Sequence, residues 1–121
     1  MTEAERFFGE RQESLACWRA LEKTVLERYP ETQIRVQKTC VSFLDSRPFC
    51  YVSLPRRREA CLLLSFGLDA PIADERIAQA MEAQPNRWTH HVDVASPEEI
   101  DEQLLFWLEL AHRMKKKGER K

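Results

Sequence analysis

Hydrophobic residues near the N-terminus recur with the spacing of a helix. Thr2 and Glu5 have the residue types and the spacing of a capping box, so a first helix is expected to begin there and to be loosened at Gly9. A longer helix is predicted over residues 11–29, where apolar residues recur every three to four positions. These residues are Leu15, Trp18, Leu21, Val25 and Tyr29. Pro30 cannot continue a helix, so the helical region should stop before it.

From residue 33 the apolar period shortens to two, which indicates strands. Ile34 and Val36 alternate with polar residues, as in a strand with one face in water. Segments 41–44 and 49–54 flank the turn-forming sequence DSRP at 45–48, which predicts a hairpin that pairs Phe43 with Cys50. A fourth strand is expected at 60–66, which is apolar on both faces and follows an arginine-rich tip at 55–59.

The last third of the chain predicts a helix, a strand and a second helix. Residues 74–84 suggest a shorter helix with Ile77, Ala80 and Met81 inward, and 87–94 (RWTHHVDV) should form the last strand. Ser96 and Glu99 fit a second capping box, with a proline between them at the first helical position. An apolar stripe then continues to about residue 114.

These elements predict an α+β fold with the order α-β-β-β-β-α-β-α. Strands joined by short hairpins are antiparallel, so a five-stranded antiparallel sheet with helices packed on one face is expected. No linker, repeat or low-complexity segment divides the chain. A single domain over residues 1–121 is therefore predicted, with a basic tail from about residue 115.

The charge balance narrows the classes of function. Nineteen Lys and Arg face twenty Asp and Glu, a formal net charge of −1. Dedicated nucleic-acid and membrane-surface proteins need an uncompensated basic field, which this balance argues against. The N-terminus has charges where a signal peptide needs an apolar segment, and no apolar run approaches the ~20 residues of a membrane span. The four cysteines form no CxxC pair, so reduced thiols and a soluble, cytoplasmic protein are expected.

Several segments together resemble one bacterial family. They are KTCVSF at 38–43, LSFGL at 64–68, and RWTHHV at 87–92 followed by Ser96 and Pro97. Over roughly residues 7–111 the chain resembles a small family of unknown function labelled "predicted transport protein". More remotely it is similar to YdhG-like domains, some of which are assigned a frataxin-like, iron-delivering role. That resemblance implies iron or other metal handling as an alternative function.

The two adjacent histidines of the last strand are expected to have different roles. Neighbouring strand residues point to opposite faces of a sheet, so His90 and His91 cannot readily bind one metal ion. His90 shares its face with Trp88 and should be a buried, hydrogen-bonded histidine beneath the helices. His91 shares its face with Arg87 and Thr89 and stays available for a ligand.

The uncovered face of the sheet is the predicted binding surface. Its candidate residues are Lys38, Ser42, Arg87, Thr89 and His91. Cations beside neutral hydrogen-bonding groups suit an anionic small molecule or a peptide segment. The leading hypothesis is a non-catalytic binding or adaptor module that requires no cofactor.

Other classes stay open as alternatives. A nucleic-acid accessory module would use the tip formed by Arg56, Arg57 and Arg58, although no aromatic residues alternate with these arginines for base stacking. No Cys or His pair has the spacing of a metal site, and no nucleophile motif is recognisable, so neither metal ligands nor catalytic residues are assigned. Leu105 and Phe106 fall outside the apolar stripe of the final helix, which indicates either a wider core contact or a homodimer interface.

Overall fold

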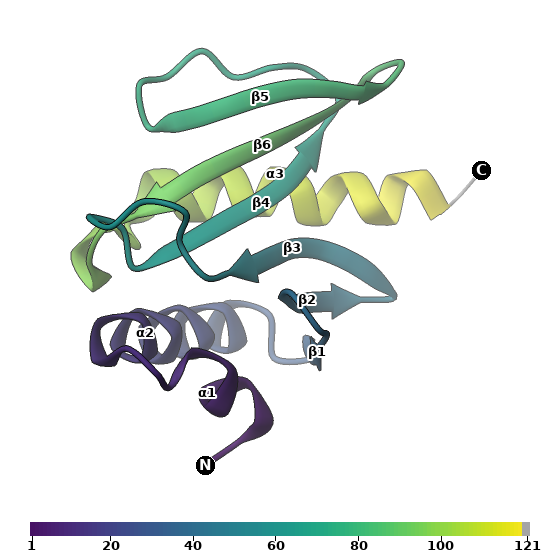
Figure 1. Ribbon diagram of the computed structural model, residues 1–121. Helices are drawn as coiled ribbons and strands as arrows, with labels where there is room; N and C mark the ends of the chain where they lie inside the picture. Colours follow the sequence, from purple (N-terminus) through teal and green to yellow (C-terminus); the bar gives the residue numbers. More distant parts are fainter. Residues whose placement is uncertain (120–121) are drawn as a thin grey trace.

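The computed structural model describes the backbone of residues 1–119 and the side chains of residues 1–114. Two N-terminal helices are followed by six strands and a C-terminal helix (Figure 1). The helices are α1 (Glu3–Phe8), α2 (Gln12–Arg28) and α3 (Glu102–Glu119), the last preceded by a 3-10 turn, η1 (Pro97–Glu99). The strands are β1 (Gln33–Val36), β2 (Val41–Asp45), β3 (Arg47–Ser53), β4 (Leu62–Leu68), β5 (Ile77–Gln84) and β6 (Arg87–Val94). The α+β class is confirmed.

The six strands form one antiparallel sheet in the order β1-β2-β3-β4-β6-β5. Each of the five neighbouring pairs is antiparallel. The predicted pairing of Phe43 with Cys50 is confirmed, and Ser46 closes that hairpin with a positive φ of 67°. The short β1 lies at one edge of the sheet and β5 at the other, so β3 and β4 form its centre, flanked by β2 and β6.

The predicted helix at 74–84 is wrong, because these residues include β5. The segment is rich in alanine, glutamine and glutamate, which favour helices in isolation. Helix propensity is a weak preference, and pairing with residues 87–92 of β6 overrides it here. The sheet therefore has six strands instead of five, and the observed order is α-α-β-β-β-β-β-β-α.

Both long helices pack on the same face of the sheet. Trp18 of α2 stacks on Phe43 of β2 with ring centroids 5.3 Å apart, and Trp107 of α3 lies 6.4 Å from Phe66 of β4. Phe43 and Phe66 point to the same face of the sheet. This follows from the residue pairings of β3 with β2 and of β3 with β4. Figure 1 shows α3 running behind β4 and β6. No helix within residues 1–119 lies over the opposite face of the sheet, which is called the open face below.

The two predicted capping boxes have different outcomes. At α1 the Thr2 hydroxyl accepts from the Glu5 amide, and the Glu5 carboxylate accepts from the Thr2 amide, so that prediction is confirmed. Before α3 the Ser96 side chain makes no capping hydrogen bond, and the residues after it form η1. The helix begins at Glu102, where the carboxylate of Asp101 accepts from the Leu104 amide. Asp101 also receives two hydrogen bonds from Arg76, at 2.9 and 3.1 Å.

Asp101→Ala is expected to lower the free energy of unfolding by about 1–2 kcal/mol, because the variant loses a helix cap. Ser96→Ala should change it by less than about 0.5 kcal/mol, the usual range for a surface substitution. Urea denaturation of both variants measures the difference. An equal loss in the two variants would contradict the placement of the cap at Asp101.

The paired residues Leu105 and Phe106 are separated by the fold. Leu105 belongs to the core, with 5% of its surface exposed, so the wider core contact holds for this residue. Phe106 is 56% exposed on the outer side of α3. The homodimer through these residues stays a prediction that now depends on Phe106 alone. The side chains of the basic tail lie outside the described residues.

Candidate functional site

A row of mostly polar side chains crosses the open face from one edge of the sheet to the other. Each strand contributes one residue at the same level, and consecutive members are paired across neighbouring strands. In strand order they are Arg35, Ser42, Tyr51, Ser65, His91 and Gln79. The row places His91 on the open face, as predicted from the alternation of side chains along a strand.

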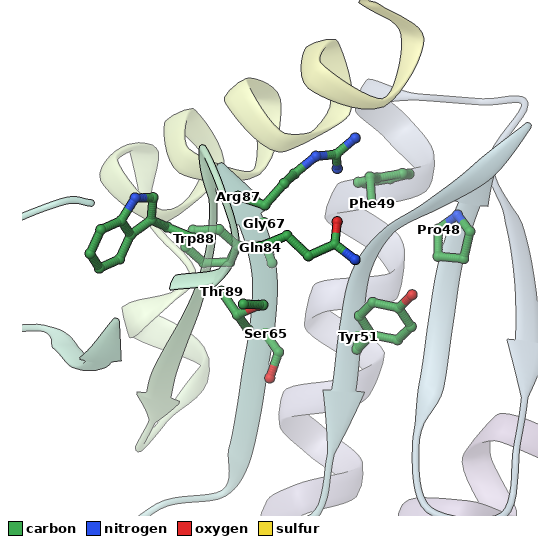
Figure 2. Close-up of a pocket in the computed structure, with 11 residues that line it drawn as sticks. Pro48, Phe49, Tyr51, Ser65, Gly67, Gln84, Arg87, Trp88 and Thr89 are labelled. Atoms are coloured by element: carbon green, nitrogen blue, oxygen red, sulfur yellow. The ribbon is translucent and has the colours of Figure 1, made fainter. Parts of the chain in front are cut away.

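A cavity of about 190 Å³ lies next to this row, above Gly67 of β4. Gly67 pairs with Thr89, and a β-carbon added at Gly67 would meet the Trp88 carbonyl oxygen at 3.9 Å and no nearer atom. The missing side chain therefore leaves a hollow in the surface of the sheet. The walls come from β3 and from the hairpin between β5 and β6, including Tyr51, Gln84 and Arg87 (Figure 2).

The lining of this cavity combines one cation with neutral hydrogen-bonding groups. Among the eleven residues that line it, Arg87 is the one that carries a charge. Arg87 is half-buried and has no ionic partner among the side chains described, residues 1–114. Figure 2 shows the side chains of Arg87 and Gln84 extending from the hairpin toward the side of the cavity formed by Phe49 and Tyr51. Tyr51, Ser65 and Thr89 add hydroxyl groups.

His91 is connected to this cavity through Ser65. The Ser65 Oγ lies 2.8 Å from His91 Nδ1, and Ser65 lines the cavity. Burial lowers the pKa of His91, and the nearby charge of Arg56 lowers it further, while Asp93 acts in the opposite sense. The imidazole is therefore more readily neutral than a free histidine, beside an arginine that attracts anions.

The neighbouring histidine is structural, as predicted. His90 is fully buried and stacks on Phe66 with ring centroids 5.4 Å apart. Its Nε2 accepts a hydrogen bond from the Ile72 amide at 3.0 Å, and its Nδ1 lies 3.2 Å from the Trp88 carbonyl oxygen. The first bond requires an unprotonated Nε2, so Nδ1 carries the proton and donates to that carbonyl. Burial lowers the pKa of His90, which favours this neutral form.

The structure brings together some of the predicted site residues and not others. Arg87 and Thr89 line the cavity, and His91 adjoins it. Ser42 is on the open face but is 1% exposed, and its hydroxyl donates to Gln37 Oε1 at 3.1 Å. Lys38 lies in the turn between β1 and β2, closed by the bond from the Gln37 amide to the Cys40 carbonyl, far along the strand order from β6. Lys38 therefore does not share a site with His91.

The arginine tip between β3 and β4 extends toward the open face. Arg57 is engaged by two acidic residues, at 3.3 Å from Glu59 and 3.8 Å from Asp93. Arg56 and Arg58 are exposed and have no ionic partner among the described side chains. Since Arg56 acts electrostatically on His91, the tip adds one available cation near the row of polar residues.

Some residues of the site were missed from the sequence. Tyr51, Ser65, Gly67 and Gln84 line the cavity but were not predicted as site residues. Gly67 was expected to end the strand predicted at 60–66, but it lies inside β4, where a glycine often marks a close approach of backbone or ligand. Gln84 gave no signal, since its segment was expected to be helical. Within the described residues no three His, Cys, Asp or Glu side chains are placed to hold a metal ion.

Comparisons with known proteins identify a family and nothing more specific. The sequence model of DUF5655, described as a domain of unknown function, matches residues 3–115. No curated protein and no solved structure shows significant similarity to the chain. The wider resemblance to YdhG-like domains receives no support from these comparisons. Within residues 1–119, no helix has the length and apolar character required to cross a membrane.

Proposed function

Because the chain belongs to DUF5655, a domain of unknown function, we propose a function from the site alone: a non-catalytic module that binds a small anionic molecule on the open face of its sheet. The observation that carries the proposal is the cavity above Gly67 with Arg87 at its wall. A half-buried arginine without an ionic partner among the described side chains keeps its charge available to a ligand. A carboxylate or phosphate group can bind it through charge-assisted hydrogen bonds.

The size and the neutral lining of the cavity further restrict the ligand. Its volume of about 190 Å³ is below the ~300 Å³ at which drug-sized pockets begin. The hydroxyls of Tyr51 and Thr89 can donate to anion oxygens, and Phe49 forms part of an apolar wall. A small carboxylate, or a carboxylate group of a peptide, fits these features. Arg56, which acts electrostatically on His91, extends the favourable field beyond the cavity.

An enzyme is the second candidate, favoured by one observation. The 2.8 Å contact between Ser65 and His91 is the arrangement of a nucleophile and a general base. In such sites a third group orients the base, and within the described residues no side chain bonds the second ring nitrogen of His91. We therefore place binding first. Turnover of an activated ester that is lost in Ser65→Ala would reverse this order.

Two substitutions test the binding proposal by titration with acetate and with inorganic phosphate, followed by NMR. Arg87→Gln should raise the Kd about tenfold or more, because a hydrogen bond to a charged group contributes roughly 1.5–3 kcal/mol. Gly67→Val should abolish binding, since the added side chain fills the hollow. The free energy of unfolding of that variant should be unchanged or raised by up to about 1 kcal/mol, because glycine is unfavourable inside a strand.

Arg58→Gln is the matched control. Arg58 is exposed, has no ionic partner in the described part of the chain, and does not line the cavity. Its loss should leave the Kd for both anions within about twofold, since surface charges contribute little. Equal weakening by Arg58→Gln and Arg87→Gln would indicate a diffuse charge effect and would contradict a site at Gly67. Full binding by Gly67→Val would do the same.

A further inference from the structure

A second cavity lies where the end of α2 and the residues after it, the end of β2, and α3 meet. Its volume is about 260 Å³. The lining residues are Arg28, Tyr29, Pro30, Glu31, Thr32, Asp45 and His112. None of them belongs to the cavity above Gly67. This second cavity was not anticipated from the sequence, and it is called the His112 cavity below.

One wall of the His112 cavity is held rigidly. His112 Nε2 lies 2.8 Å from an Asp45 carboxylate oxygen, and 7% of the His112 surface is exposed. The Tyr29 ring stacks on the imidazole with centroids 4.3 Å apart, and the Phe49 ring meets it edge-on at 4.9 Å. Three contacts therefore fix the imidazole from three directions, as in a preorganised binding site.

Two hydroxyl groups in this wall lack hydrogen-bond partners. The Tyr29 hydroxyl and the Thr32 Oγ1 are both buried, and neither bonds to any group that the structure describes. Buried polar groups are nearly always satisfied, so each exception needs an explanation such as a bound molecule. Burial raises the pKa of Tyr29, with a further contribution from Glu109, against the opposing effects of Arg28 and Arg113. The phenol therefore stays protonated and keeps a hydrogen to donate.

The charges around the cavity indicate what kind of molecule would satisfy these hydroxyls. Arg28 lines it together with Glu31 and Asp45, so a ligand of either charge would meet a like charge. Arg28 is also 3.5 Å from Glu102, which further reduces its attraction for an anion. A neutral ligand avoids this conflict. It must offer both donors and acceptors, because the lining contains a guanidinium, carboxylates and two hydroxyls that can do either.

We propose that the His112 cavity binds a neutral polyhydroxylated molecule of about monosaccharide size, held by the Tyr29 and Thr32 hydroxyls. The volume excludes larger sugars from full enclosure. The aromatic and imidazole rings supply an apolar side beside the polar groups, a combination that suits the C–H and O–H groups of a polyol. No residue lines both this cavity and the cavity of the anion site proposed above, although Phe49 lines the latter and packs against His112.

The test is NMR titration of the intact protein with glycerol, myo-inositol and glucose at millimolar concentrations. Saturating shifts of the His112 ring and the Thr32 amide are expected with at least one of them. Tyr29→Phe and Thr32→Val should each weaken that binding about fivefold to tenfold, the usual effect of losing one neutral hydrogen bond. Tyr51→Phe removes a hydroxyl on the open face instead, so it should leave polyol binding unchanged.

The same variants distinguish two explanations of the unpartnered hydroxyls, a ligand-binding site and a bound structural water. Because the two hydroxyls are unpartnered in the free protein, Tyr29→Phe and Thr32→Val should keep the Tm of the parent chain. A lowered Tm without any polyol binding would mean that a structural water satisfies them, and would overturn the proposal. Stronger saturable shifts with acetate or methylammonium than with the polyols would overturn the choice of a neutral ligand.

Discussion

Replacing Trp18 with alanine is expected to lower the free energy of unfolding by about 3–5 kcal/mol, the usual cost of removing a large buried aromatic ring. Trp18 is fully buried and lies between two other rings, 5.1 Å from Phe8 and 5.3 Å from Phe43. It therefore joins α1 and α2 to the helix-covered face of the sheet. Urea denaturation followed by circular dichroism measures the change.

Trp18→Phe separates packing from hydrogen bonding at the same position. The indole N–H of Trp18 is buried and has no hydrogen-bond partner within the described residues. Phenylalanine keeps a ring between Phe8 and Phe43 and removes this unsatisfied donor, so a smaller loss of roughly 1–2 kcal/mol is expected. A loss in Trp18→Phe as large as in Trp18→Ala would mean that the N–H makes an essential bond, contrary to the structure.

Acidification should destabilise the fold because of His90. Its folded-state pKa lies below the value of about 6.5 for an unfolded chain, so the unfolded state binds the proton more tightly. Stability is therefore highest above pH 6.5 and is lost as the pH falls from there toward the folded-state pKa. His91 contributes with the same sign, because its pKa is also lowered. Urea denaturation at a series of pH values measures the slope.

His90→Phe is the informative variant for this effect. The new ring can still stack on Phe66, but the Ile72 amide loses its acceptor, so a loss of roughly 1–3 kcal/mol is expected at neutral pH. The decline in stability below pH 6.5 should become shallower, since one proton-binding group is gone. His91→Gln serves as the comparison on the open face. An unchanged pH dependence in His90→Phe would contradict the assignment.

The strand that contains the two histidines was predictable because its chemistry is local. Alternation along 87–94 assigned His90 to the covered face and His91 to the open one, and the structure agrees on both. Successive side chains of a strand point to opposite faces, so this assignment requires only that residues 87–94 be recognised as a strand. The pairing of Phe43 with Cys50 was also predicted correctly, but it depends on a feature the sequence did not indicate: the turn pairs Asp45 with Arg47, and a register shift between Phe43 and Leu44 then brings Phe43 opposite Cys50.

The strand β5 could not be predicted from the sequence, because it is determined by tertiary contacts and not by its local residue pattern. Ile77, Ala80 and Met81 have the three-to-four spacing of a helix, and the residue types agree with that spacing. The strand exists because residues 87–92 of β6 pair with it. Because the segment was predicted to be helical, Gln84 was not identified as part of a wall of the cavity above Gly67.

The two cavities could not be predicted from the sequence for a different reason. Each is formed by segments that are distant along the chain, such as Asp45 and His112, which are separated by 67 positions. A weak signal existed for His112, since Leu104, Leu108 and His112 recur every four residues along one side of α3. A histidine on an apolar stripe requires a polar partner, but nothing local identifies that partner as Asp45.

The register of β5 also affects how the molecule behaves at high concentration. This strand forms a free edge of the sheet and carries one charge, Glu82, which would ordinarily invite pairing with another chain. Its pairing with β6 shifts between Ile77 and Gln79 and again between Glu82 and Gln84. Such bulges bend a strand and increase its twist. Four residues of β5 therefore remain in regular register and could pair with a strand of another chain. The irregular edge thus protects the domain from growing into an extended intermolecular sheet.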